Sequence, residues 1–376
     1  MDLAVVGAGI VGASVARCAA RAGLSVVLLD KGDLGGAVSA ASLACIGTHM
    51  ILPEEVPLLV HCCRIWAGLE AETDCDIEHR RCGQLRFVLD PVDLPVASAW
   101  LEQERAHGLP RSLLDPKEVR EIEPLLTGPI VAASWSPDAS TVNPFLAVRA
   151  CIRDARRHGA RILPRTPVTA VEMRAGSVVG VRTPSETIPS AAVVVAAGPW
   201  AAGLLTPLGV DLPIVPRKAQ CLATTRQPAG TIRTVVANCE TSVGVQAGYT
   251  QIQQAASGQI LFNTVLGGAA MTPGSPDAPA PVDETFVASS VDMLVRLFPA
   301  LADKTLLRSW VGYESVCPDD RFAVGQVGPG GLFVASGCNG IGFTRAPAIG
   351  EIVTDLVLQR TPRPEARLYD PLRLAA

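Results

Sequence analysis

The residues with the clearest chemical purpose stand at the start of the chain, where a short apolar run leads into a glycine-rich turn. The run 3–6 predicts a strand, Gly7, Gly9 and Gly12 follow it with the spacing G-x-G-x-x-G, and Asp30 ends the next apolar run. In a βαβ unit the first glycine permits a tight turn, the second lets a pyrophosphate approach the backbone, and the third lets the helix pack closely on the strand. The pattern therefore predicts a dinucleotide-binding site.

The elements around this turn are those that such a site requires. Helical periodicity over residues 10–22 places Ile10 and Val11 at the first turn of a helix, whose N–H groups and dipole attract a diphosphate. The apolar run 25–30 predicts a second strand, and Asp30 at its end can accept ribose hydroxyls. Glycine-rich turns also occur as plain connections, but the strand before, the helix after and the acid together favour a nucleotide site.

Length and composition narrow the class of protein. A chain of 376 residues predicts two domains. The net charge is −4 and no run of lysine or arginine forms a stripe, so a small-molecule partner is expected and nucleic acid is not. No apolar run free of charge reaches the roughly 18 residues of a membrane span. Because the chain begins on its first strand, we expect no signal peptide and a cytoplasmic location.

The cysteines indicate neither disulfides nor a metal. Eleven is an odd number, and no pair has C-x-x-C spacing. In apolar surroundings, free cysteine behaves as a small hydrophobic residue. We therefore expect no metal site.

Three further landmarks follow the turn in order along the chain: residues 41–47, residues 193–200, and residues 317–319 with 337–343. Together with Gly7 to Gly12 and Asp30, they resemble the FAD-dependent D-amino-acid oxidase superfamily. This superfamily includes glycine oxidase, sarcosine oxidase, and the flavin subunits of heteromeric proline, hydroxyproline and opine dehydrogenases. The resemblance spans nearly the whole chain.

The resemblance implies an α/β fold with a discontinuous Rossmann-type FAD-binding domain and an interleaved antiparallel-sheet substrate domain. The FAD-binding domain is expected at 1–80, 142–212 and 308–376, and the substrate domain at 81–141 and 213–307. Local patterns agree, since residues 190–197 are typical of a strand buried on both faces, and residues 213–266 alternate as in a half-exposed antiparallel sheet.

The resemblance also assigns expected contacts to FAD. Asp30 and Lys31 would lie at the adenosine ribose and Val168 at the adenine. Ala197 and Gly198 would close over the diphosphate near Trp200, although a plain tight exit from the strand is the alternative reading of that glycine. The segment containing Ser42, Leu43 and Gly47 would pass beside the isoalloxazine. The flavin pyrimidine edge would be lined by Asn339, Gly340, Ile341, Gly342 and Phe343.

Departures from the family bear on the substrate. In glycine-oxidase-like members an arginine before the Pro-Asp motif binds the substrate carboxylate, but this chain has Glu314. An ionised acid repels a carboxylate, so either another cation binds it or Glu314 reads a cationic part of the substrate. Arg217, Lys218 and Arg345 are the candidate cations, each with the alternative of a solvated or structural role.

Two other departures bear on the flavin. Sarcosine-oxidase relatives attach flavin through a cysteine at the position of Gly312, so we expect noncovalent FAD. Oxidases of that group also carry a lysine that promotes the reaction with oxygen, and residues 248–268 contain none. Because this lysine is absent, the resemblance favours a dehydrogenase over a glycine- or sarcosine-type oxidase.

The predicted reaction is oxidation of the C–N bond of an amino acid or secondary amine, with hydride transfer to flavin N5 and no strong base required. His49, Tyr249 and Glu314 are the expected polar residues on the substrate side, and for a histidine just past a loop the alternative is a structural role. Two other hypotheses remain: a flavin-bearing electron-transfer subunit that needs partner subunits, and a flavin-binding scaffold without turnover.

Overall fold

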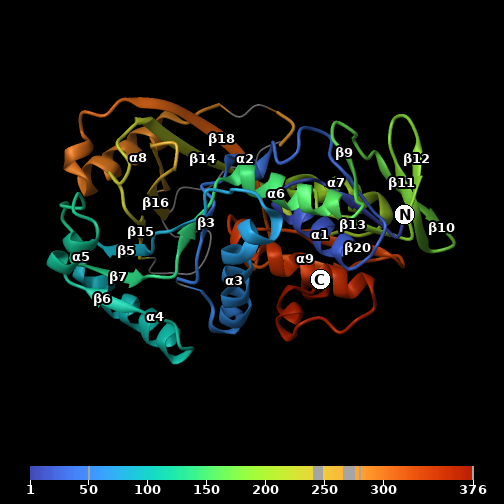
Figure 1. Ribbon diagram of the computed structural model, residues 1–376, viewed down its shortest axis with the longest axis horizontal. Coiled ribbons are helices and arrows are strands. Elements are labelled where there is room, and N and C mark those ends of the chain that lie inside the picture. Colours follow the sequence, from blue (N-terminus) through green and yellow to red (C-terminus); the bar gives the residue numbers. More distant parts are fainter. Residues whose placement is uncertain (50, 240–248, 266–275, 279–280, 375–376) are drawn as a thin grey trace.

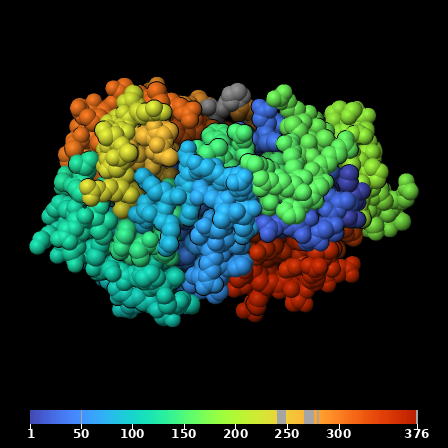
Figure 2. Space-filling model, viewed as in Figure 1, coloured from blue at the N-terminus to red at the C-terminus, as the bar shows by residue number. Residues whose placement is uncertain are grey.

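The computed structural model describes residues 1–49, 51–239, 249–265, 276–278 and 281–374. Two lobes lie side by side (Figure 1). In the space-filling view the start of the chain, the green middle segment and the red C-terminal segment gather at one end, while teal and orange segments gather at the other (Figure 2). Each lobe is therefore assembled from segments distant in the sequence, as the interleaved organisation predicted.

The nucleotide-binding lobe is built on a six-stranded sheet with the order β19-β20-β13-β1-β2-β9. Its pairs are parallel except for the antiparallel edge pair β19–β20. The strands are β1 (Leu3–Val6), β2 (Val26–Leu29), β9 (Arg161–Leu163), β13 (Ala192–Val195), β19 (Ala323–Gln326) and β20 (Leu332–Ser336).

Helices cover one face of this sheet. They include α1 (Ile10–Arg21), α3 (Val56–Thr73), α6 (Pro144–Arg157) and α9 (Gly342–Val357). The other face packs against α7 (Ala201–Leu205) and a small sheet of β10 (Ala170–Arg174), β11 (Ser177–Arg182) and β12 (Thr187–Pro189). Because both faces are covered, β13 is entirely buried, which confirms the interpretation of its continuous apolar run.

The second lobe contains an eight-stranded sheet with the order β18-β14-β17-β16-β15-β5-β7-β6. The strands are β5 (Gln84–Val88), β6 (Ser112–Leu114), β7 (Ala132–Ser136), β14 (Val215–Arg226), β15 (Val235–Asn238), β16 (Tyr249–Gln254), β17 (Gln259–Val265) and β18 (Leu306–Val316). One face forms an apolar core with α8 (Glu284–Leu297) and α5 (Pro116–Ile122), and α4 (Leu94–Ala106) lies at the periphery.

Short elements join the lobes. A small sheet of β3 (Cys45–Ile46), β8 (Ser140–Thr141) and β4 (Arg80–Arg81) lies between them, and α2 (Val38–Ala41) contacts β18. Long-range pairing also produced features that local patterns did not predict. The expected domain boundary at 308 falls inside β18, and β15 pairs in parallel with β5 within a mainly antiparallel sheet. Among the described helices, none has both the length and the apolar character that crossing a bilayer requires.

Candidate functional site

A cavity of about 1300 Å³ runs between the lobes. It begins at the glycine-rich turn after β1 and reaches the eight-stranded sheet and the first turns of α8. Every predicted site residue lines it except Gly12: Gly7, Gly9, Ile10, Val11, Asp30, Lys31, Ser42, Leu43, Gly47, His49, Val168, Ala197, Gly198, Trp200, Tyr249, Glu314, Asn339, Gly340, Ile341, Gly342 and Phe343. The fold thus brings residues from eight separate stretches of the sequence to one cavity.

The geometry of the turn explains its glycines. Gly7 has φ of +105°, and a Cβ there would lie 2.5 Å from the carbonyl oxygen of Ala196. A Cβ on Gly12 would lie 1.8 Å from the carbonyl oxygen of Gly7. No side chain fits at either position without moving the backbone. Gly12 therefore has the helix-packing role that the motif predicted.

Polar groups around this turn suit a dinucleotide. The Asp30 carboxylate accepts N–H bonds from Ala8 at 2.6 Å and from Gly32 at 2.8 Å, which fixes it beside the turn. The N–H of Ile10 at the start of α1 donates to Ser39 Oγ at 2.9 Å. A fixed acid, a helix N-terminus and a backbone cradle kept open by glycine are the features that hold ribose and diphosphate. The residues present therefore fit FAD.

A side-chain cluster closes the outer part of this end of the cavity. Asp277 accepts from Lys31 Nζ and from Trp200 Nε1, each at 2.7 Å, and Lys31 Nζ lies 3.9 Å from the centre of the Trp200 ring. These hydrogen bonds, the one from Lys31 first, lower the pKa of Asp277. Lys31 and Trp200 were expected near the nucleotide, whereas Asp277 was not predicted because it comes from the other lobe.

Small residues let chain segments meet beside the predicted flavin site. Trp310 Nε1 donates to the carbonyl oxygen of Ala41 at 3.1 Å. A Cβ on Gly312 would lie 2.7 Å from Ala41 Cβ, so any side chain at 312 must displace this segment. Gly47 lies similarly close to Ala139, with 3.3 Å from an added Cβ to the alanine Cβ.

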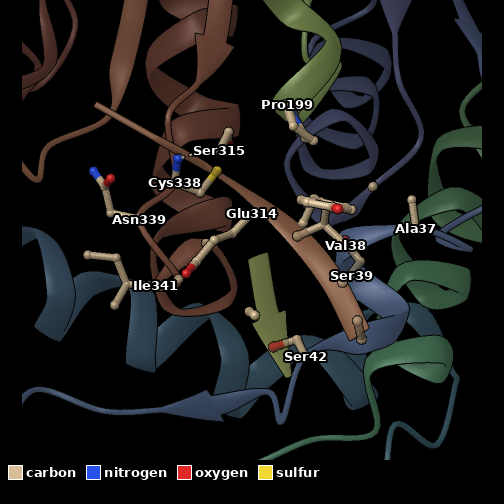
Figure 3. A pocket seen from close by; sticks show the side chains of 18 of the residues that line it. Ala37, Val38, Ser39, Ser42, Pro199, Glu314, Ser315, Cys338, Asn339 and Ile341 are labelled. Carbon is tan, nitrogen blue, oxygen red and sulfur yellow. Dashed lines mark hydrogen bonds between the residues drawn. The ribbon is translucent and has the colours of Figure 1, made fainter. Parts of the chain in front are cut away.

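The side chain of Asn339 holds the turn before α9 in place. Asn339 has φ of +47°; its Oδ1 accepts from the Cys317 N–H and its Nδ2 donates to the Gly337 carbonyl oxygen, both at 3.0 Å. The amide therefore shapes the turn that lines the cavity. Figure 3 shows this turn, with the Glu314 carboxylate pointing toward it. Gly340 leaves room for that carboxylate, because an added Cβ would lie 2.7 Å from Glu314 Oε2.

Glu314 does not stand alone in the cavity. Arg217 on β14 lies directly opposite Glu314 on β18, and its Nε donates to Glu314 Oε1 at 2.8 Å. Both side chains are largely buried, with 12% and 11% exposed. The predicted repulsion of a carboxylate by Glu314 is thus offset by a cation in contact with it.

The other two candidate cations are held elsewhere. Lys218 Nζ donates to the Pro281 carbonyl oxygen at 2.7 Å. Arg345 is buried and donates through two nitrogens to Glu55, which also accepts from Tyr369 Oη at 2.6 Å. Arg345 is therefore part of a structural ion pair. Arg217, paired with Glu314, remains the candidate cation for a substrate carboxylate.

His49 is enclosed in the cavity wall. Its Nε2 lies 2.6 Å from Ser134 Oγ, and the side chain is buried. Burial first, and the charges of Arg86 and Arg111 second, hold the pKa of His49 well below its usual value of 6.5. The imidazole is therefore neutral at physiological pH and a weak base.

Tyr249 begins a line of hydrogen bonds. Its hydroxyl contacts Gln251 Oε1, Gln251 Nε2 donates to Gln253 Oε1 at 2.7 Å, and Gln253 Nε2 donates to the Leu43 carbonyl oxygen at 2.7 Å. The line connects the sheet to the segment expected beside the flavin. Gln251 and Gln253 were not predicted, although polar residues alternating with Tyr249 along one strand face gave a signal for them.

Strand register creates a polar row that the sequence alone did not indicate. Arg86 lies opposite both Ser134 and Ala237, Ala237 lies opposite Gln251, and Gln251 lies opposite Asn263. Directly paired residues point to the same face of a sheet. Arg86, Gln251 and Asn263 line the cavity. Within the described ranges, no group of three or more histidine, cysteine, aspartate or glutamate side chains could hold a metal ion.

The fold and the cavity define an α/β protein with a Rossmann-type nucleotide-binding sheet and a second, mainly antiparallel sheet that lines the other end of the cavity. The DAO family model, whose description is FAD dependent oxidoreductase, matches residues 2–356. The chain therefore belongs to the DAO family of FAD-dependent oxidoreductases.

Individual relatives span the whole chain. It is 30% identical to the monomeric sarcosine oxidase of Streptomyces avermitilis over 387 residues, covering 100% of this chain and 98% of the relative. It is 26% identical to the glycine oxidase of Bacillus subtilis over 368 residues, covering 96% and 93%. Among solved structures, the L-proline dehydrogenase of P. horikoshii superposes with a TM-score of 0.89 at 27% identity, covering 99% of this chain and 97% of that one.

Proposed function

We propose that this enzyme oxidises the C–N bond of an amino acid or secondary amine, such as an imino acid, an opine or an N-alkyl amino acid. The observation that carries the proposal is the single cavity joining the nucleotide turn at Gly7 to the Arg217–Glu314 pair and Tyr249. The related sarcosine oxidase, glycine oxidase and L-proline dehydrogenase support this substrate class. FAD, when bound, supplies the two-electron acceptor.

The protein's contribution is binding and orientation. Arg217 carries the charge that a substrate carboxylate needs, and only its contact with Glu314 Oε1 occupies it among the described side chains. Guanidinium has five N–H donors, so Arg217 can keep Glu314 and still bind a carboxylate. His49, buried and neutral, serves as a wall of the substrate space with a hydrogen bond to Ser134.

We further propose that FAD is held without a covalent bond and that the enzyme is a dehydrogenase. Gly312 offers no thiol, and its contact with Ala41 leaves no space for one. Two of the described lysines line the cavity. Lys31 is bonded to Asp277 and Lys218 to the Pro281 carbonyl oxygen, and neither belongs to the polar row of Arg86, Gln251 and Asn263. The second candidate function is an oxidase that passes its electrons to oxygen, and the similarity to a glycine oxidase and a sarcosine oxidase favours it.

One experiment separates these possibilities. The purified yellow protein is mixed anaerobically with a panel of glycine, sarcosine, L- and D-proline, hydroxyproline and opines. Bleaching of the flavin absorbance by an amine supports C–N oxidation, and no bleaching by any of them contradicts it. Re-oxidation of the bleached protein by an added dye but not by air supports the dehydrogenase, and fast re-oxidation by air supports the oxidase. Acid precipitation that leaves the flavin in solution supports noncovalent binding.

A further inference from the structure

A buried guanidinium lies directly behind the cavity wall. Arg111 follows α4 and precedes β6, is only 5% exposed, and does not itself line the cavity. Its Nε donates to the Glu104 carboxylate. Its Nη1 donates to the Pro110 carbonyl oxygen at 3.0 Å and to Asp138 Oδ1 at 2.8 Å, and its Nη2 donates to the carbonyl oxygen and the Oγ1 of Thr48 at 3.1 and 2.6 Å. A guanidinium has five N–H groups, so every donor of Arg111 is in use.

Thr48 is the residue on which this network converges. It is fully buried, and both its backbone and its side chain are bonded to Arg111. Its hydroxyl also donates to Asp138 Oδ2 at 2.7 Å, so one hydroxyl accepts from a cation and donates to an anion. Burial opposes ionisation of Asp138, but the hydrogen bond from Ser136 and the charge of Arg111 outweigh it and hold the pKa of Asp138 below its usual value. Moving Thr48 would therefore leave two donors of Arg111 unpaired in the interior.

The residues on either side of Thr48 form part of the cavity wall. Gly47 and His49 line the cavity, whereas Thr48 does not, so this short segment is held from behind and presents its other side to the cavity. Each neighbour is itself constrained: a Cβ on Gly47 would lie 3.3 Å from Ala139 Cβ, and His49 Nε2 lies 2.6 Å from Ser134 Oγ. Gly47 ends the segment expected beside the isoalloxazine. The network around Thr48 thus fixes a part of the wall that the flavin is expected to meet.

The helix α4 supplies and holds Arg111. Glu104 in the last turn of α4 pairs with its guanidinium, and the next residue, Arg105, donates from Nε to the Arg111 carbonyl oxygen at 2.9 Å. After Arg111 the chain enters β6, which pairs with β7. Thr48, by contrast, comes two residues after β3 in the small sheet between the lobes. The chain from α4 to β6, which lies at the periphery of the second lobe (Figure 1), therefore reaches the wall of the cavity through one side chain.

We propose that Arg111 is a positioning residue for the flavin site, which acts through Thr48 to set the segment 47–49 before FAD binds. The inference rests on the proposed function only through the placement of FAD in this cavity, and it gives the peripheral helix α4 a part in that function. A segment that is already ordered does not have to lose its conformational freedom on binding, so the affinity for the cofactor is higher. Without the network, FAD would have to order the segment itself.

A matched pair of threonine variants tests the inference. Thr48→Val removes the hydroxyl that joins Arg111 to Asp138 and keeps the size of the side chain. Thr234→Val is the control, since Thr234 is 3% exposed, donates its hydroxyl to Glu123 Oε2 at 3.2 Å, and lies in the same lobe as Arg111 but outside the cavity lining. The dissociation constant of FAD should rise about tenfold in Thr48→Val, near the lower end of what a charged hydrogen bond contributes. In Thr234→Val it should change by less than about twofold, even if both melting temperatures fall equally.

Two further variants separate positioning from a general loss of packing. Thr48→Ser keeps the hydroxyl and should recover the natural FAD affinity. Arg111→Lys keeps the charge, but an ammonium group cannot reach Glu104, Asp138 and Thr48 together as the planar guanidinium does, so this variant should behave like Thr48→Val. The visible circular dichroism of bound FAD reports the surroundings of the isoalloxazine. It should change in Thr48→Val and Arg111→Lys and stay natural in Thr48→Ser and Thr234→Val. If Arg111→Lys does not fold, the threonine variants decide the question.

Both measurements use FAD and the protein without substrate. Equal FAD affinity and equal circular dichroism in Thr48→Val and the natural chain, or a loss in Thr48→Ser as large as that in Thr48→Val, overturns the inference. An equal loss of FAD affinity in Thr48→Val and Thr234→Val also overturns it, because that loss would reflect general stability. Bleaching of the flavin by amines is measured separately. Absence of bleaching in the natural chain removes the proposed function and leaves this test unaffected, whereas a normally bleached Thr48→Val with natural FAD affinity keeps the proposed function and loses only this inference.

Discussion

Arg217 and Glu314 face each other across neighbouring strands of the substrate-side sheet, with Arg217 Nε 2.8 Å from Glu314 Oε1. The pair places a cation one strand away from the position where family relatives are expected to carry theirs. Glu314 then has two possible roles, to hold Arg217 in place for a carboxylate or to read a cationic part of the substrate itself. The two roles predict opposite effects of neutralising the acid.

We expect Arg217→Met to weaken binding of a carboxylate ligand by at least about tenfold, because the charged hydrogen bond is lost. Glu314→Gln should leave carboxylate affinity equal or higher, since Arg217 is no longer neutralised by its neighbour. The measurement is titration of the flavin spectrum with pyrrole-2-carboxylate at two salt concentrations. A large loss of affinity for a dicationic amine in Glu314→Gln, with carboxylate binding unchanged in Arg217→Met, would instead assign Glu314 to a substrate cation.

The nucleotide turn gives a sharper prediction. Gly12→Ala should abolish FAD retention and strongly destabilise the fold, since its Cβ would lie 1.8 Å from the Gly7 carbonyl oxygen. Gly68→Ala is the matched control, because Gly68 lies inside α3 and outside the cavity lining, and an added Cβ there would lie 3.6 Å from its nearest neighbour, Glu72 Oε1. The control should keep FAD and gain up to about 1 kcal/mol in helix propensity. Flavin content per chain and the melting temperature report both effects, and a yellow, stable Gly12→Ala protein would contradict this account of the turn.

The sequence predicted this end of the molecule well because its signals are local. The strand–turn–helix around Gly7 and the acid at Asp30 are separated by few residues, and steric rules restrict them strongly. The substrate side was predicted less completely. Tyr249 and Glu314 were predicted to face the substrate and line the cavity, but the contact of Glu314 with Arg217, and the row containing Arg86 and Asn263, depend on strand register between distant segments. No local pattern specifies that register.

The close approach of Gly312 to Ala41 predicts a compensating pair of substitutions. Gly312→Ala should destabilise the protein by about 1–3 kcal/mol, the usual effect of an extra methyl group in a packed site. Ala41→Gly in the same chain should recover much of this loss, because it removes the methyl group that the new Cβ meets. Free energies of unfolding of the two single variants and the double variant test the coupling. Additive changes in the free energy of unfolding would show that positions 312 and 41 are not energetically coupled.

Buried His49 predicts how stability depends on pH. Because burial and nearby arginines hold the pKa of His49 well below 6.5, the folded protein leaves this ring neutral while the unfolded chain takes up a proton near pH 6.5. The unfolded state binds more protons in that range, so the contribution of His49 to stability is full above pH 6.5 and falls as the pH is lowered, by at most about 1.4 kcal/mol per pH unit.

His49→Gln, which can still bond to Ser134, should flatten the stability profile between pH 7 and 5, measured by urea unfolding. His107→Gln, at the exposed end of α4, controls for the loss of one histidine. Equal slopes for the natural chain and His49→Gln would mean that the imidazole is protonated inside the fold, and would reopen His49 as an acid or base in the reaction.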